Sequence, residues 1–176
     1  LLQLTLTTVN AQQTLIIDGS ALTFLATGDF KIHCPAQLVL TPHQEEWHRL
    51  SGLKISAQNP IANQTALADK FPKQTILVLK QHRTEIYSHQ DIFQNTSGTA
   101  AMATGGMGDT LTGIIAALIA QFKNVLPATL AAVYLHGLAG QLVGATHYVA
   151  LPSALIEQIP ELMAQYSQRP STSGLT

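Results

Sequence analysis

Charge and cysteine are both scarce in this chain. Only 11% of its 176 residues are charged, the formal net charge is -1, and no stretch concentrates lysine and arginine. A protein that binds nucleic acid through its phosphates needs a basic patch, so we expect no nucleic-acid partner. With a single cysteine, Cys34, no internal disulfide can form, which is typical of a reducing compartment and predicts a cytoplasmic protein.

Long hydrophobic runs are also missing. The most apolar window, residues 111–122, is too short to cross a bilayer, so no membrane association is predicted. The first residues, LLQLTLTTVNAQQ, include neither an initiator Met nor the basic start of a signal peptide, and we expect the N-terminal part of the domain to be missing. Hydrophobic residues are nevertheless plentiful, at 46%, and are enough for one domain with a large buried core.

Strand and helix patterns alternate along the chain. Short β-rich runs predict strands at residues 14–17, 37–40, 75–80, 84–88 and 91–93. Helices are predicted through 22–25, from Thr41 as N-cap to about Gly52, at 60–71, 109–122 and 127–144, and at 151–166 with a break at Pro160. This order predicts an α/β fold, a three-layer α/β/α sandwich around a largely parallel sheet.

The segment NTSGTAAMATGGMGDTLTGII, residues 95–115, joins a glycine turn to an apolar helix and carries one acid. Gly105, Gly106 and Gly108 let the backbone approach a ligand closely, and the first amides of the helix are unpaired donors. With the helix dipole they form a site for phosphate or developing negative charge. Asp109 would repel such an anion, so it serves either as a general base for a hydroxyl group or only as a helix cap. The spacing does not decide between the two.

Several stretches together resemble one known family. The glycine segment NTSGTAAMATGGMGDTLTGIIAALIAQ is similar to the anion-hole segment of the NAD(P)H-hydrate dehydratases, within the ribokinase-like superfamily. The stretches LIIDGSAL, LTPHQEEWHRL, LVLKQHRTEI and AVYLHGLAG resemble other segments of that family, in the same order. The resemblance implies a ribokinase-like domain over residues 1–166, of which this chain is the C-terminal portion. The polar residues 167–176 are expected to form a loose tail.

The resemblance implies an activity and a set of site residues. Family members repair hydrated NADH or NADPH: with ADP or ATP and Mg²⁺ they phosphorylate the hydroxyl group of the hydrate and then eliminate phosphate. By motif, Asp109 is the base, His43 contacts the hydrate, and Glu46 helps to organise Mg²⁺ through water. The nucleotide-binding residues implied are Lys80, Gln81, His82, Arg83, Thr84 and Gly108. The anion hole implied comprises Gly105, Gly106, Met107 and Gly108.

Five positions limit the resemblance or have simpler interpretations. Gln44 and Glu45 stand where the family has proline and glycine, and Gln81 replaces the glycine after the lysine, which predicts a nucleotide loop less able to approach phosphate. Asp18 is interpreted as part of an Asp-Gly turn, and His136, within an apolar helix, as a core residue.

Partners and rival functions follow from the same resemblance. It implies a homo-oligomer, a tetramer in the family, and possible association with an NAD(P)H-hydrate epimerase. Two alternatives remain: a ribokinase-like kinase of a small vitamin-precursor alcohol, and a catalytically inactive domain that binds nucleotide or packs in an assembly.

Overall fold

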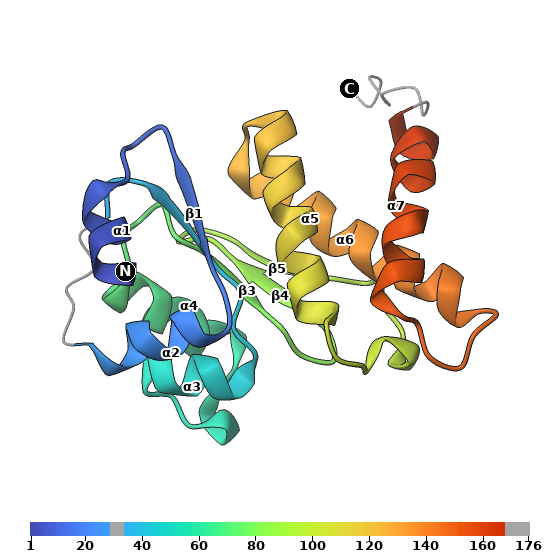
Figure 1. Cartoon of the computed structure of the whole chain (residues 1–176). Coiled ribbons are helices and arrows are strands. Elements are labelled where there is room, and N and C mark those ends of the chain that lie inside the picture. Colours follow the sequence, from blue (N-terminus) through green and yellow to red (C-terminus); the bar gives the residue numbers. More distant parts are fainter. Residues whose placement is uncertain (29–33, 168–176) are drawn as a thin grey trace, which may run out of the picture.

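A five-stranded sheet forms the centre of the molecule. The computed structural model describes residues 1–28 and 34–167 (Figure 1). The strands, in spatial and chain order, are β1 (Thr14–Ile17), β2 (Gln37–Leu40), β3 (Ile76–Leu79), β4 (Glu85–Tyr87) and β5 (Ile92–Gln94). β1, β2 and β3 pair in parallel, whereas β4 is antiparallel to both of its neighbours. Among the described strands β4 alone therefore runs in the opposite direction, and the prediction of a largely parallel sheet is confirmed.

Helices cover both faces of the sheet (Figure 1). One layer contains α1 (Leu2–Thr8), α2 (Ser20–Thr27), α3 (Gln44–Ser51) and α4 (Pro60–Lys70), and the other contains α5 (Met107–Phe122), α6 (Val125–Gly144) and α7 (Pro152–Ser167). Residues of β3 alternate between the two cores, since Ile76 and Val78 pack in the cluster with α5 and α6 while Leu77 and Leu79 pack in the cluster with α2 and α3. Because successive side chains of a strand point to opposite faces, an all-apolar strand indicates cover on both sides. The predicted three-layer arrangement is confirmed.

The start of α3 differs from the prediction. Its N-cap is His43 and not Thr41. Thr41 is buried and donates a hydrogen bond to the Ile17 carbonyl (3.4 Å), and the carbonyl of Pro42 accepts one from the Lys80 amide (2.8 Å). The chain thus stays extended beside its neighbouring strands for two residues past the expected cap.

Other helix boundaries also differ. α1 was not predicted, and α5 and α6 begin at Met107 and Val125, each two residues before the expected start. α7 continues through Pro160, so the predicted break is wrong. Proline removes one helical hydrogen bond, but Pro160 is exposed and so is Ile156, whose carbonyl would have accepted that bond; water can replace it. The predicted loose tail lies outside the described residues apart from Ser167, the last residue of α7.

α6 is the most apolar long helix of the described chain. Its length and composition would allow it to cross a membrane, but 56% of its most apolar window is buried inside the protein. It packs against both α5 and α7, and Ala132, Val133 and Ala139 on it are almost completely buried. Packing within the helical layer accounts for its hydrophobicity.

Candidate functional site

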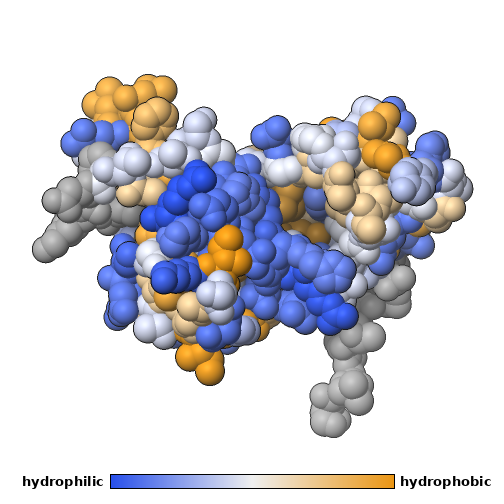
Figure 2. All heavy atoms as spheres, turned by 90° about the horizontal axis from the view of Figure 1, so that it is seen from below, coloured by the Kyte–Doolittle hydropathy of each residue, from blue (hydrophilic) through white to orange (hydrophobic). Residues whose placement is uncertain are grey.

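The candidate site lies where three strands end and α5 begins. Asp18 directly follows β1, Lys80 directly follows β3, and the isolated parallel bridge between His43 and Lys80 extends the pairing of β2 and β3. In Figure 1 the carboxyl end of β1 and the N-terminus of α5 both lie at the lower side of the molecule. Figure 2 views this side directly, and hydrophilic residues cover its middle. In open α/β sheets this is the edge at which ligands bind.

Asp18 is the centre of a polar network that connects the sheet to α5. Its carboxylate accepts hydrogen bonds from Lys80 Nζ (2.8 Å, also an ion pair) and from Thr112 Oγ1 (2.8 Å). Burial raises the pKa of Asp18, but the hydrogen bonds from Lys80 and Thr112 and the charge of Lys80 outweigh it, so the pKa is lowered below 3.8. The interpretation of Asp18 as a turn residue therefore missed its main contacts.

The first turn of α5 presents backbone amides next to the Lys80 ammonium group. Gly106 is the N-cap with a left-handed φ of 86°, a conformation that favours glycine. The first helical bond joins the Thr110 amide to the Gly106 carbonyl (2.9 Å), so the amides of Met107, Gly108 and Asp109 precede it. A Cβ placed on Gly108 would lie 3.3 Å from Lys80 Nζ. Lysine charge and helix amides thus converge on one place, where they favour an anion.

Asp109 lies at the rim of this anion-favouring turn. It is the third residue of α5, and its side chain is exposed to solvent. The N-cap Gly106 has no side chain and makes no side-chain cap hydrogen bond. The exposed carboxylate of Asp109 is accessible to a ligand.

His43 and Glu46 form a capping box at the start of α3. His43 Nδ1 accepts from the amides of Glu45 (3.2 Å) and Glu46 (3.3 Å), and a Glu46 carboxylate oxygen accepts from the His43 amide (2.8 Å). The His43 side chain is 54% exposed, whereas that of Glu46 is 11% exposed. His43 is therefore accessible to a ligand, while Glu46 is already engaged in holding the helix start.

The carboxylates of this region suit a magnesium ion only in part. No group of three or more His, Cys, Asp or Glu side chains within residues 1–28 and 34–167 is arranged to hold a metal. Mg²⁺ commonly binds one or two carboxylates and takes its remaining ligands from water and substrate phosphates. The residues fit a Mg²⁺ ion that is coordinated mainly by substrate phosphates and water. They do not fit a site in which protein side chains supply all the ligands.

A pocket of about 300 Å³ opens beside the anion-favouring turn, between the loop after β3, the loop before α5, and α6. Among the predicted nucleotide residues, Gln81, His82 and Thr84 line it, and Arg83 lines a neighbouring pocket of similar volume that shares His82. The side-chain amide of Gln44 donates to Gln81 Oε1 (3.2 Å). Two of the residues that depart from the family pattern are therefore hydrogen-bonded to each other.

The same pocket contains polar residues that sequence reasoning did not assign to a site. They are Asn95, Ser97, Thr99 and His136. Asn95 and Ser97 are joined to α6, because Asn95 Nδ2 donates to the Val133 carbonyl (3.5 Å) and Ser97 Oγ donates to the Tyr134 carbonyl (2.8 Å). His136 was expected in the core, and it is indeed 8% exposed, but it also lines the pocket. Only the approach of α6 to the 95–99 loop brings these residues together.

Replacing Gly137 with Ala is expected to destabilise this wall of the pocket. A Cβ at Gly137 would lie 2.8 Å from the backbone carbon and 2.9 Å from the backbone oxygen of Ser97, atoms that cannot move without the loop. Overpacking of this kind costs about 1–3 kcal/mol of unfolding free energy. Urea denaturation would measure it. Gly113→Ala is the matched control, since nothing lies within 4 Å of its Cβ position and the helix should gain about 0.5–1 kcal/mol. Equal stability of the two variants would contradict the close approach of α6.

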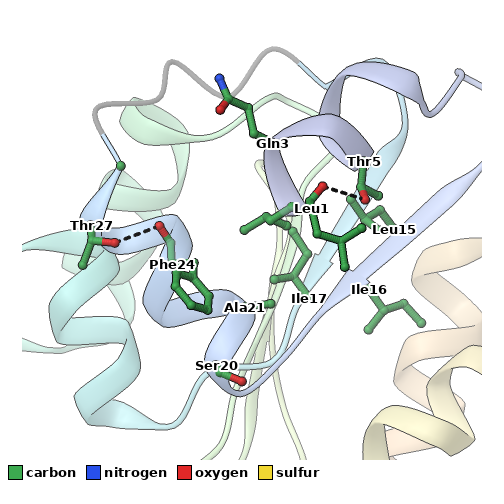
Figure 3. A pocket seen from close by; sticks show the side chains of 12 residues that line it. Leu1, Gln3, Thr5, Leu15, Ile16, Ile17, Ser20, Ala21, Phe24 and Thr27 are labelled. Atoms are coloured by element: carbon green, nitrogen blue, oxygen red, sulfur yellow. Dashed lines mark hydrogen bonds between the residues drawn. The ribbon is translucent and has the colours of Figure 1, made fainter.

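A larger pocket than this one lies elsewhere, along the outer edge of β1. It has a volume of about 700 Å³, and Figure 3 shows Leu1, Leu15, Ile17 and Phe24 of α1, β1 and α2 around it. Its polar lining residues, Gln3, Thr5, Ser20 and Thr27, are uncharged. These lining residues include no charged side chain that could act as an acid or a base, so the chemistry is assigned to the smaller pocket and to the start of α5.

The chain is similar to known proteins along nearly its whole described length. A protein-family model described as NAD(P)H-hydrate dehydratase matches residues 2–161. Curated proteins named ADP-dependent (S)-NAD(P)H-hydrate dehydratase are 45% identical over 168 residues in Enterococcus faecalis and 45% identical over 169 residues in Lactiplantibacillus plantarum. Both alignments cover 96% of this chain, but 57% and 59% of the two relatives. The chain therefore spans less than two thirds of their length.

Solved structures confirm the ribokinase-like fold. A ribokinase-like superfamily protein from Enterococcus faecalis V583 superposes with a TM-score of 0.89 at 45% identity, over 96% of this chain and 58% of that one. The ADP/ATP-dependent NAD(P)H-hydrate dehydratase of Bacillus subtilis, co-crystallised with ATP and Mg²⁺, gives a TM-score of 0.77 at 29% identity, over 88% of this chain and 56% of that one. Staphylococcus aureus pyridoxal kinase, with a TM-score of 0.51 at 22% identity, shares the fold alone.

Proposed function

The chain belongs to the NAD(P)H-hydrate dehydratase family, and from this premise we propose that the protein uses ADP or ATP to dehydrate hydrated NADH or NADPH. One observation carries the proposal. The exposed carboxylate of Asp109 directly follows the amides of Met107 and Gly108, with the Lys80 ammonium group beside Gly108. A base and an anion site are thus held next to each other, which is what transfer of a phosphoryl group to a hydroxyl requires.

The anion site would receive the phosphoryl group. Amides of the α5 first turn, from Met107 to Asp109, lie at the positive end of the helix dipole, and the Lys80 ammonium group, although paired with Asp18, lies beside Gly108. Gly105 leaves room for phosphate to approach the backbone, since nothing lies within 4 Å of its Cβ position, whereas a Cβ at Gly106 would lie 3.2 Å from Pro152 Cγ. The nucleoside part then extends into the 300 Å³ pocket, past Gln81, His82 and Thr84, with Arg83 at its outer side.

Asp109 would accept the proton of the substrate hydroxyl. As the O–H bond breaks, the oxygen attacks the terminal phosphorus of the nucleotide, and the bond from that phosphorus to the nucleotide's bridging oxygen breaks. The phosphate ester formed is a better leaving group than hydroxide. Its C–O bond then breaks while a proton leaves the adjacent carbon, so phosphate departs and the dihydronicotinamide double bond is restored. AMP is the by-product from ADP, and ADP is the by-product from ATP.

The remaining roles follow from accessibility and charge. His43, at the exposed start of α3, is proposed to contact the hydrate, since its side chain is 54% exposed; its Nδ1 accepts from helix amides and its Nε2 lies 3.5 Å from a Glu46 carboxylate oxygen. Mg²⁺ would bind mainly through the phosphates and water, and it neutralises charge on the transferring group. Glu46 is proposed to act on that ion through water only. A cytoplasmic location remains a prediction from the single cysteine, and a homotetramer and association with an epimerase remain predictions from the resemblance.

Incubation of the purified protein with hydrated NADH tests the function. We expect the absorbance of dihydronicotinamide to return when Mg²⁺ and ADP or ATP are present, and not when either nucleotide or Mg²⁺ is omitted. Parallel reactions with ADP and ATP identify the donor, and parallel reactions with hydrated NADH and NADPH identify the substrate. Absorbance that stays flat with a folded protein that binds ADP would contradict dehydration. The proposed function would then be replaced by one of the two alternatives, a kinase of a vitamin-precursor alcohol or an inactive nucleotide-binding domain.

A further inference from the structure

The imidazole of His136 is buried and incompletely paired. The residue is 8% exposed, and its Nε2 atom has no hydrogen-bond partner in residues 1–28 and 34–167. Buried polar groups are nearly always hydrogen-bonded, and an exception is a reason to look for a missing partner. His136 also lines the 300 Å³ pocket, so the missing partner can come from a ligand in that pocket.

The second ring nitrogen fixes what kind of partner Nε2 needs. His136 makes a hydrogen bond with the backbone of Met107, the first residue of α5, and because Nε2 is unpaired this bond belongs to Nδ1. Burial lowers the pKa of His136 to about 4, while the bond to Met107 opposes this change, so the ring is neutral at physiological pH. A hydrogen bond that raises the pKa of a histidine stabilises the protonated ring. In such a bond the imidazole N–H is the donor and the backbone is the acceptor. Nδ1 therefore carries the hydrogen, and Nε2 is a hydrogen-bond acceptor.

The position of His136 indicates which part of a ligand it meets. Through Met107 the ring is attached to the first turn of α5, where the proposed function places the phosphates. Its other pocket neighbours are Thr84 of the loop after β3, Asn95 and Ser97 of the loop before α5, and Leu111 of α5. A ligand whose phosphates lie at the helix start would place its nucleoside among these residues.

We propose that His136 is a specificity-determining residue of the nucleotide site, and that its Nε2 accepts a hydrogen bond from an N–H or O–H group on the nucleoside of ADP or ATP. This inference rests on the proposed function, because it takes the phosphates to lie at the start of α5. Two groups have the required chemistry: the amino group of the base and a hydroxyl of the ribose.

Calorimetric titration of the 176-residue chain with four nucleotides separates the two groups. The ligands are ADP, purine riboside diphosphate without the amino group, 2′-deoxyADP and 3′-deoxyADP. We expect one analogue to bind about ten-fold more weakly than ADP, as the loss of one hydrogen bond implies. His136→Asn keeps a donor near the Nδ1 position and lacks Nε2. The variant should bind ADP about ten-fold more weakly than the unmodified protein does. It should bind ADP and the analogue that lacks the contacted group with equal affinity.

The controls distinguish the inference from its alternatives. His147→Asn, at an exposed position outside the pocket, should bind all four nucleotides as the unmodified protein does. Equal affinity of the unmodified protein for all four nucleotides would overturn the assignment of His136, whether or not the variant folds. Equal weakening of all four by His136→Asn would also overturn it, since that result indicates a structural role. Failure of the unmodified protein to bind ADP at all would instead refute the nucleotide site of the proposed function.

Discussion

Replacing Asp109 with Asn is expected to lower kcat by roughly 10²–10⁴-fold, the usual contribution of a positioned general base. The amide has nearly the same shape as the carboxylate but cannot accept the hydroxyl proton. Because Asp109 is exposed and lies in the first turn of α5, the change should leave the fold intact. It also removes a negative charge beside the phosphate site, so ADP should bind as well as before or more tightly. Steady-state kinetics of NADH recovery and ADP titration would measure the two effects.

A matched control is Asp69→Asn. Asp69 is also an exposed acid on a helix, but it lies on α4 in the other helical layer. We expect unchanged kcat and unchanged ADP affinity for this variant. Unchanged kcat for Asp109→Asn would show that the residue only contributes charge at the helix start, and the capping interpretation would replace the base.

Replacing Asp18 with Asn is expected to lower the free energy of unfolding by roughly 3 kcal/mol, the lower end of the range for breaking a largely buried ion pair. The side chains of Asp18 and Lys80 are only 14% and 21% exposed, so the variant leaves the Lys80 ammonium with little water and no counter-charge. Urea denaturation at neutral pH would measure the loss. The double variant Asp18→Asn, Lys80→Met should recover part of it, because the uncompensated charge is gone.

The same pair predicts a pH dependence with a definite sign. The folded-state pKa of Asp18 is lowered from its ordinary value of 3.8, so the folded protein prefers the ionised form. The stabilisation is therefore fully present above about pH 4 and is lost as pH falls through the folded-state pKa. We expect the stability difference between the unmodified protein and Asp18→Asn to be constant from about pH 5 to 7 and to shrink in acid.

Asp91→Asn, at an exposed position between β4 and β5, is the control for both measurements. It should be as stable as the unmodified protein, with the same pH dependence. A difference for Asp18→Asn that persists at pH 2 would contradict an electrostatic origin and would point to packing.

Sequence patterns anticipated the elements whose signals are local. β1 and β2 have the predicted bounds, and α4 begins with Asn59 as N-cap and Pro60 at its first position. These features depend on hydrophobic periodicity and on capping contacts within a few residues, both of which can be seen in the sequence. The glycine turn and Asp109 were identified for the same reason, since glycines and an acid before an apolar helix form a local pattern.

Contacts between distant segments escaped prediction. Thr41 was expected to cap α3, but the backbone bond between Pro42 and Lys80 keeps that segment extended and moves the cap to His43. The break expected at Pro160 did not occur, because packing of Leu155 and Leu162 against the neighbouring helices holds α7 in one piece across an exposed proline.

By itself, the sequence determined the α/β class, the order of elements and the glycine turn with its acid, because each is set by neighbours along the chain. Only the tertiary structure decided the ion pair of Asp18 with Lys80, 62 residues away, and the place of His136 at once in the core and beside a pocket. These depend on strand register and on the close approach of α6 to the 95–99 loop. Such long-range geometry is the result of packing the whole chain, and no local pattern specifies it.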